Sequence, residues 1–268
     1  MIKLIASDLD GTLLDNEKHL PSDFFEVFDE LERRGIQFAV ASGRTYSAVG
    51  HLFPEEYRSK ITFICDNGAC VIKNGKTLHT KALDRETYEE LLAACAEIGG
   101  LKPIVCAESG IFHLGYSEDF RADVSRYYLY HSAVENLYGV PDPIYKFTVR
   151  DDLGPIINGK PALDKIFGDR LNIQVSGDVW IDIMTSGVSK GEALTALQKS
   201  MEITKSETMA FGDYFNDVEM LQNAEFSVCP ENAHDEIKQM CKLICADCNH
   251  NGVTECIKKI VLGENVWT

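Results

Sequence analysis

Two aspartates near the start of the chain, Asp8 and Asp10, are the residues whose type and spacing most directly indicate chemistry. They follow an apolar run at 2–7, which is too short for a helix and is typical of a buried parallel strand. Side chains two apart on a strand point to one side, so both carboxylates are predicted to face the same space. Like charges at close range raise a pKa or attract a cation. Gly11 and Thr12 then predict a sharp turn that the threonine hydroxyl anchors.

Other residues that could do chemistry fall at similar places, just after a predicted strand or at a predicted helix start: Ser42, Gly43, Lys190, Asp213, Asn216 and Asp217. A doubly wound parallel sheet brings such positions together along one edge. With Asp8 and Asp10 they supply carboxylates, an ammonium, a hydroxyl and an amide. This set suits phosphoryl transfer through a covalent intermediate. One aspartate attacks phosphorus, another exchanges protons, Mg²⁺ binds carboxylate oxygens, and the remaining polar groups stabilise charge on the phosphoryl oxygens.

Each of these residues also has an ordinary structural interpretation when it is taken singly. Ser42 alone is typical of a turn or cap, and Lys190 alone is typical of a solvated helix. Asp217 alone suits an N-cap, and Arg44 is balanced between a substrate contact and a structural ion pair. Their joint order, at the ends of successive predicted elements, favours one shared site.

The hydrophobic pattern predicts an α/β fold whose doubly wound parallel-sheet core comprises 1–80 and 186–268. Ser22 is the expected N-cap of a first helix that Gly35 ends. Asn74-Gly75 predicts a type I′ hairpin. Alternating strands with a few helices at 81–185, where Asp84 caps a long amphipathic helix, predict an inserted α+β cap on an antiparallel sheet.

Composition narrows the classes of partner. The 268 residues carry a formal net charge of −16, which argues against nucleic-acid and anionic-membrane binding. No apolar run approaches the roughly 18 residues of a membrane span, and the start does not resemble a signal peptide, so a cytoplasmic protein is expected. Nine scattered cysteines suggest reduced, buried thiols. The late cluster Cys241, Cys245 and Cys248 is a possible zinc site, but Cys241 and Cys245 fall at helical spacing. We favour core packing over zinc for this cluster.

Four short motifs together resemble the haloacid dehalogenase (HAD) superfamily, specifically its Cof-type (subfamily IIB) phosphatases. They are Asp8-Leu9-Asp10-Gly11-Thr12, Ser42-Gly43-Arg44, Lys190 and Gly212-Asp213-x-x-Asn216-Asp217. The segments Asn67-Gly68-Ala69 and Val188-Ser189-Lys190-Gly191, and the closing pattern at 231–260, also resemble that subgroup. One departure is Tyr214, where many relatives carry a glycine.

The resemblance implies a role for each matching position. Asp8 is the nucleophile that forms aspartyl phosphate, and Asp10 is the general acid and base. Mg²⁺ is held by the Asp8 carboxylate, the Asp10 backbone carbonyl and Asp213, while Asp217 supports the metal site through water or hydrogen bonds. The phosphoryl group is held by a further set, namely Ser42, the Leu9 and Gly43 backbone amides, Lys190 and Asn216. Arg44 reaches the substrate or the cap.

The expected activity is hydrolysis of a small phosphorylated metabolite, most naturally a sugar phosphate, with a cap that closes over the leaving group. A sugar phosphomutase or phosphotransferase of the same superfamily is the enzymatic alternative, and a non-catalytic phosphometabolite-binding protein is the other. Retention of Asp10 favours the phosphatase, because a binding protein needs no acid for a leaving group. Aromatic residues of the cap, such as Phe147 and Trp180, could line a substrate pocket but are more typical of core.

Overall fold

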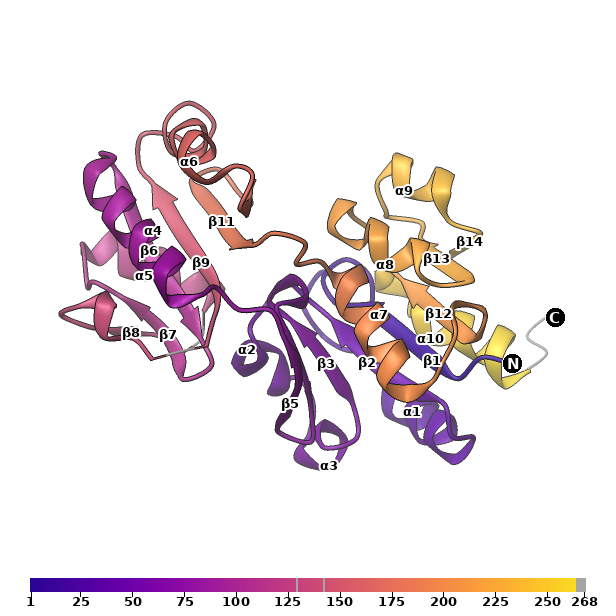
Figure 1. Ribbon diagram of the computed structural model, residues 1–268. Coiled ribbons are helices and arrows are strands. Elements are labelled where there is room, and N and C mark those ends of the chain that lie inside the picture. Colours follow the sequence, from indigo (N-terminus) through magenta and orange to yellow (C-terminus); the bar gives the residue numbers. More distant parts are fainter. Residues whose placement is uncertain (129, 142, 264–268) are drawn as a thin grey trace. The chain divides into compact units, whose positions relative to one another are not determined.

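The computed structural model describes residues 1–128, 130–141 and 143–263, which divide into two compact units (Figure 1). The first unit comprises Met1–His79 and the segment that begins at Ser189, and the second comprises Thr80–Val188. The second unit thus starts one residue before the predicted insertion, 81–185, and ends three residues after it. Among the described residues, no helix combines the length and the apolar content that a membrane span requires.

The first unit is built on a sheet with the strand order β14-β13-β12-β1-β2-β3-β4-β5. The strands from β14 to β3 pair in parallel, and β4 pairs with β3 in the antiparallel direction. Their bounds are β1 Leu4–Asp8, β2 Gln37–Ala41, β3 Thr62–Cys65, β4 Cys70–Lys73, β5 Lys76–Thr80, β12 Thr208–Phe211, β13 Phe226–Pro230 and β14 Leu243–Cys245.

Helices cover both faces of this sheet, as a doubly wound fold requires. On one face, Leu4 of β1 belongs to a buried cluster with Leu194 of α7 and Leu221 of α8. On the other, the ring of Phe38 on β2 lies 5.5 Å from that of Phe24 on α1. The helices are α1 Phe24–Arg33, α2 Tyr46–Gly50, α3 Glu55–Arg58, α7 Lys190–Met201, α8 Val218–Gln222, α9 Asp235–Met240 and α10 Gly252–Ile257. Short turns of 3₁₀ or π type are η1 Asp66–Gly68, η3 Lys205–Glu207, η4 Phe215–Asp217, η5 Cys248–His250 and η6 Lys258–Leu262.

The second unit has a sheet in the order β10-β11-β9-β6-β7-β8, antiparallel except for the β7–β8 pair. Leu91 and Leu163, from α4 and α6, belong to one buried cluster of this unit, and Phe120 of α5 belongs to another. Phe147 and Trp180 are both buried in these clusters, as the core interpretation expected. The bounds are α4 Arg85–Glu97, β6 Leu101–Ala107, β7 Gly110–His113, α5 Glu118–Tyr127, β8 Ser132–Ala133, η2 Leu137–Gly139, β9 Ile144–Asp151, α6 Gly159–Phe167, β10 Leu171–Val175 and β11 Trp180–Thr185.

The predicted fold class, a doubly wound α/β core with an α+β cap, is confirmed, and several local signals hold as well. Gly35 follows α1 with φ +72°, and Asn74 and Gly75 have φ +50° and +67°, the signs that a type I′ turn requires. The Asp84 carboxylate accepts a hydrogen bond from the Thr87 backbone amide at 2.8 Å, so it is the N-cap of α4.

Two local predictions are wrong. Ser22 is not the N-cap of α1, because the helix begins at Phe24 and Asp23 takes the cap position. The Asp23 side chain instead accepts a hydrogen bond from Thr254 at 2.9 Å. Cys241 and Cys245 do not share a helix, since Cys241 ends α9 and Cys245 lies on β14. Cys241 packs against the apolar cluster beneath α7 and α8.

Candidate active site

The predicted site residues gather at the carboxyl end of the parallel strands. Asp8 is the last residue of β1 and pairs in register with Ala41, the last of β2, so Ser42 follows beside it. Asp213 comes two residues after β12, the strand on the other side of β1. A concave pocket of about 310 Å³ lies here, lined by Asp8, Asp10, Ser42, Gly43, Arg44, Asp213, Tyr214 and Asn216.

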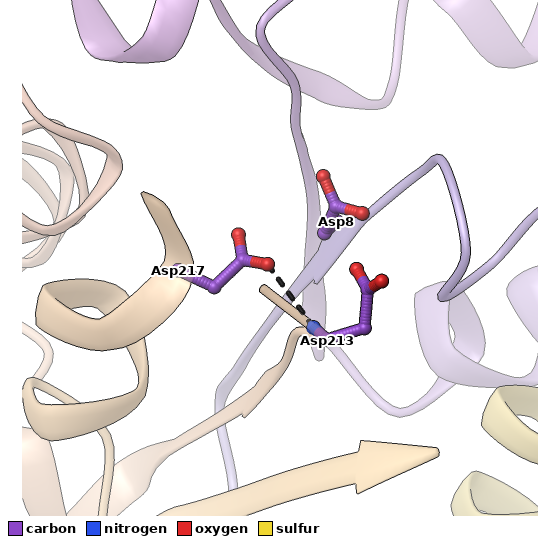
Figure 2. A group of neighbouring side chains, drawn as sticks. All are labelled: Asp8, Asp213 and Asp217. Carbon is purple, nitrogen blue, oxygen red and sulfur yellow. Dashed lines mark hydrogen bonds between the residues drawn. The ribbon is translucent and has the colours of Figure 1, made fainter. Parts of the chain in front are cut away.

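Three carboxylates of this unit converge here, and two of them, Asp8 and Asp213, line the pocket. Asp8, Asp213 and Asp217 each offer an oxygen within 4.8 Å of the others (Figure 2). Burial raises the pKa of Asp8 well above its ordinary value, and the neighbouring charges of Asp217 and Asp213 raise it further. Burial and the Asp217 charge likewise raise the pKa of Asp213. Mg²⁺ prefers hard oxygen ligands, and a bound cation relieves the repulsion between neighbouring carboxylates. These residues therefore fit the predicted cation.

Lys190 places a positive charge beside the three carboxylates. It is 1% exposed, and its Nζ donates to Asp8 Oδ1 at 2.5 Å and to Asp217 Oδ1 at 2.6 Å. Burial lowers the pKa of Lys190, but the two carboxylates outweigh it and the net shift is upward. The ammonium therefore stays charged beside the Asp8 carboxylate. Its place is set by Ser189, the N-cap of α7, whose hydroxyl accepts a hydrogen bond from the Glu192 amide at 3.0 Å.

Asp217 holds the loop that presents Asp213. Its Oδ2 accepts hydrogen bonds from the backbone amides of Asp213 at 3.1 Å and Tyr214 at 3.2 Å. The loop is tight, because a Cβ on Gly212 would lie 2.5 Å from the Cβ of Asp217. With both oxygens engaged, Asp217 orients the Asp213 loop and the Lys190 ammonium together.

The turn after β1 packs directly against Asp213. Gly11 has φ +87°, and a Cβ at this position would lie 2.6 Å from Asp213 Oδ2. The Thr12 hydroxyl, which we expected to anchor its own turn, donates to Asp213 Oδ1 at 3.0 Å. The side chain of Asn232 donates to the Gly11 carbonyl at 2.7 Å. The Asp8–Thr12 motif and the Gly212–Asp217 motif are thus locked to each other.

Asp10 lines the pocket and forms ion pairs with two cations, Arg44 and Lys18. Arg44 forms a bidentate pair with it, Nε to Oδ2 at 2.7 Å and Nη2 to Oδ1 at 2.5 Å, and Lys18 lies 2.9 Å from Oδ1. Burial raises the pKa of Asp10, but hydrogen bonds from Arg44 and Lys18 outweigh it, and the net shift is downward. The sequence predicts for Arg44 either a substrate contact or a structural ion pair. In the structure it forms the ion pair, and both partners line the pocket.

Ser42 and Asn216, which are predicted to bind the phosphoryl group, line the same pocket as Asp8 and Asp213. Ser42 is buried, and its hydroxyl accepts a hydrogen bond from the Arg44 amide at 3.1 Å. Asn216 donates through Nδ2 to Oδ1 of Asn67 at 3.2 Å. The side chain of Leu9 is fully buried, which fixes the peptide between the two aspartates.

Sequence reasoning missed three residues that organise this site: Lys18, Asn67 and Asn232. Each acts through a contact distant in sequence or through a loop conformation. Lys18 left only a weak signal, a positively charged residue in the turn that follows the aspartate motif. Asn67 left a clearer one, since an Asn-Gly pair directly after a strand favours positive φ. Asn232 left no signal beyond its place in the closing pattern.

Comparison with known proteins identifies the family. The sequence profile of the haloacid dehalogenase-like hydrolases matches residues 5–257. The chain belongs to that family. Curated relatives that match nearly the whole chain are named phosphatases, so its predicted membership of the Cof-type phosphatases is confirmed and we conclude that it is a phosphatase enzyme.

Individual relatives match over nearly the whole chain. The 5-amino-6-(5-phospho-D-ribitylamino)uracil phosphatase YbjI of Escherichia coli is 32% identical, with 98% of this chain and 97% of that protein covered. A crystal structure of a Eubacterium rectale protein superposes with a TM-score of 0.90 at 29% identity, covering 96% and 98% of the two chains. The HAD subclass IIB sugar phosphatase BT4131 shares the fold, with a TM-score of 0.78 at 22% identity over 96% of this chain and 98% of its own.

Proposed function

We propose that this protein is a Mg²⁺-dependent phosphatase that hydrolyses small phosphorylated metabolites through an aspartyl-phosphate intermediate on Asp8. The observation that carries the proposal is the environment of Asp8: a buried ammonium at 2.5 Å on one side and Asp213 within metal-sharing distance on the other. A buried carboxylate between a fixed cation and a cation site is suited to approach an anionic phosphoryl group.

Two displacements account for the reaction. In the first, a carboxylate oxygen of Asp8 attacks phosphorus, the bond from phosphorus to the ester oxygen breaks, and the Asp10 carboxyl gives its proton to the leaving alkoxide. In the second, Asp10 takes a proton from water as the water oxygen attacks phosphorus, and inorganic phosphate leaves with Asp8 restored. Lys190, Ser42 and the amides near the pocket hold the phosphoryl oxygens.

The proposed Mg²⁺ would be held by the carboxylates of Asp8 and Asp213 and by the Asp10 backbone carbonyl, with Asp217 in support. When bound, it would neutralise charge on the phosphoryl oxygens and on the carboxylates themselves. The fit rests on the donor set: three oxygen-bearing side chains converge, and one ammonium leaves their summed charge negative.

Asp10 must change partners to act as an acid. With Arg44 and Lys18 attached it is held as a carboxylate, so the acid role needs a substrate that draws at least one of these cations away. A phosphate ester is such a competitor, because arginine binds phosphate oxygens as readily as carboxylates. In this proposal Arg44 leaves Asp10 and binds the phosphate oxygens of the substrate.

We propose sugar phosphates and related polyol phosphates as the substrate class. The support is the E. coli relative, whose name records a phosphate ester of a ribitylaminouracil and thus a phosphorylated polyol chain. The cap, Thr80–Val188, is the proposed source of further specificity, since the pocket of the first unit is small and polar.

A phosphate-release screen tests the proposal. Sugar phosphates, polyol phosphates and the ribitylaminouracil ester are incubated with the protein, with and without Mg²⁺, and free phosphate is measured. We expect release from at least one ester, dependent on Mg²⁺. An isomeric sugar phosphate in place of free phosphate would point to the mutase alternative.

The variant Asp8→Asn tests the nucleophile. Its amide oxygen is a far weaker nucleophile than the carboxylate, so we expect turnover to fall by at least about 1,000-fold. Circular dichroism and the thermal midpoint should show a fold like that of the parent. Undiminished turnover in this variant would refute the assignment.

A further inference from the structure

The turn η1, which follows β3, contacts three separate segments of the site. Its residues are Asp66, Asn67 and Gly68, with φ +49°, +55° and +102°. Successive residues other than glycine with positive φ cost conformational energy, so they persist where surrounding contacts hold them. None of its three residues is a proposed nucleophile, acid, metal ligand or phosphoryl ligand.

The first contact is with the Ser42–Arg44 loop. The backbone amide of Asn67 donates to the Ser42 carbonyl at 3.0 Å, and the amide of Asp66 donates to the Arg44 carbonyl at 3.0 Å. The Asn67 side chain lies against Gly43, where a Cβ would meet its Oδ1 at 3.0 Å. The turn therefore sets the course of the loop that carries the Gly43 amide.

The second contact is with the start of α7. A Cβ on Gly68 would lie only 2.2 Å from the carbonyl oxygen of Ser189, the residue before Lys190. Only glycine permits this approach, and its φ of +102° is one that other residues rarely adopt. The turn thus abuts the residue that caps the lysine helix.

The third contact is a side-chain hydrogen bond. Asn216 donates through Nδ2 to Oδ1 of Asn67 at 3.2 Å, across 149 positions of sequence. Asn216 is exposed, so its side chain has rotamer freedom that this bond removes. Asn216 and Gly43 both line the pocket, and the Asn67 amide lies against both.

We propose that Asn67 is a positioning residue for phosphoryl binding: its side-chain amide fixes Asn216 and the Gly43 backbone in the orientation that receives the phosphoryl oxygens. The inference rests on the proposed function, because it takes the pocket to be the phosphoryl site. Asn67 acts through its neighbours, so its removal weakens phosphate binding without removing the nucleophile, the acid or the cation site.

Two substitutions separate the amide from the backbone conformation. Asn67→Gly removes the amide and accepts positive φ freely, whereas Asn67→Ala removes the amide and keeps the strain. We expect the Kd for inorganic phosphate, measured by calorimetry with Mg²⁺, to rise about 3- to 10-fold in both, the worth of one ordered hydrogen bond. The value of kcat/KM should fall by a similar factor. An impaired Ala variant beside a normal Gly variant would overturn the proposal, because the backbone alone would then matter.

Asn74 provides a matched control. It also has positive φ, +50°, but lies exposed in the β4–β5 hairpin. Asn74→Gly should leave the phosphate Kd unchanged within about twofold, which is the scatter expected of a surface substitution. An equal loss in both Gly variants would overturn the proposal.

A double-mutant cycle tests the route through Asn216. Asn216→Ala should weaken phosphate binding, and adding Asn67→Gly should then raise the Kd by a smaller factor than it does in the parent, because only the contact with Gly43 is left to lose. Fully multiplicative losses would overturn the proposal, since Asn67 would then not act through Asn216. The outcome is separate from that of the proposed function: no phosphate release from any ester would refute the latter, while the phosphate Kd of each variant would still report on Asn67.

Discussion

At the residue scale, the site is a balance of buried charges. Lys190 lies between Asp8 and Asp217, and Asp213 adds a third carboxylate nearby. One ammonium cannot neutralise three carboxylates, which is why burial and mutual repulsion raise the pKa values of Asp8 and Asp213. The three carboxylates therefore carry an excess of negative charge that the proposed Mg²⁺ would neutralise.

Removing the ammonium should expose that demand. Lys190→Met leaves buried carboxylates uncompensated, so we expect the free energy of unfolding to fall by about 3 kcal/mol in urea denaturation with a chelator present. Added Mg²⁺ should reduce the deficit, because it supplies charge to the same oxygens. Lys199→Met, at an exposed position of the same helix, is the control and should change stability by less than about 0.5 kcal/mol. A Lys190→Met protein as stable as the parent would contradict this account.

At the element scale, the strand ends carry most of what the sequence could predict. Asp8 ends one short apolar strand, and Ser42 and Asp213 follow two others, and the carboxyl ends of parallel neighbours meet at one edge. Their convergence follows from topology, which local pattern largely determines here. Lys18 and Asn67 were beyond that reasoning, because their roles depend on a loop path and on partners distant in sequence. Asp23 was missed as N-cap because its carboxylate contacts Thr254, a tertiary contact that no local pattern records.

Helices α7 and α8 are in close contact at Gly191. A Cβ on Gly191 would lie 2.4 Å from the Cβ of Glu219, so the two helices meet with no room for a methyl group. Gly191→Ala must push α7 away, and we expect a loss of about 1–3 kcal/mol in the free energy of unfolding. Because Lys190 precedes Gly191, kcat/KM should fall as well.

Gly99→Ala is the matched control for this substitution, since nothing lies within 4 Å of a Cβ there. It should leave both stability and activity near those of the parent. Equal urea midpoints for the two alanine variants would show that α7 and α8 adjust without cost.

At the scale of the whole molecule, the chain forms two units, and each has its own buried apolar cluster. The first contains every residue assigned to the phosphoryl and metal sites. The second contains a buried polar feature of a different kind: His113 is fully buried, and its Nε2 lies 2.8 Å from Nδ1 of His131. Burial, with lesser contributions from His131 and Arg121, lowers the pKa of His113 to about 4.

This histidine should make the second unit sensitive to acid. Between pH 6.5 and pH 4 the unfolded chain binds a proton at His113 that the folded chain does not, so stability falls as the pH falls. From pH 7.5 to pH 5 the loss attributable to this residue is about 2 kcal/mol. Urea denaturation at the two pH values measures it, and His113→Gln, which cannot titrate, should show a drop smaller by that amount. Because both proteins share every other titrating group, the difference between their two drops isolates His113, and equal drops would mean that its imidazole is protonated as easily in the folded unit as in the unfolded chain.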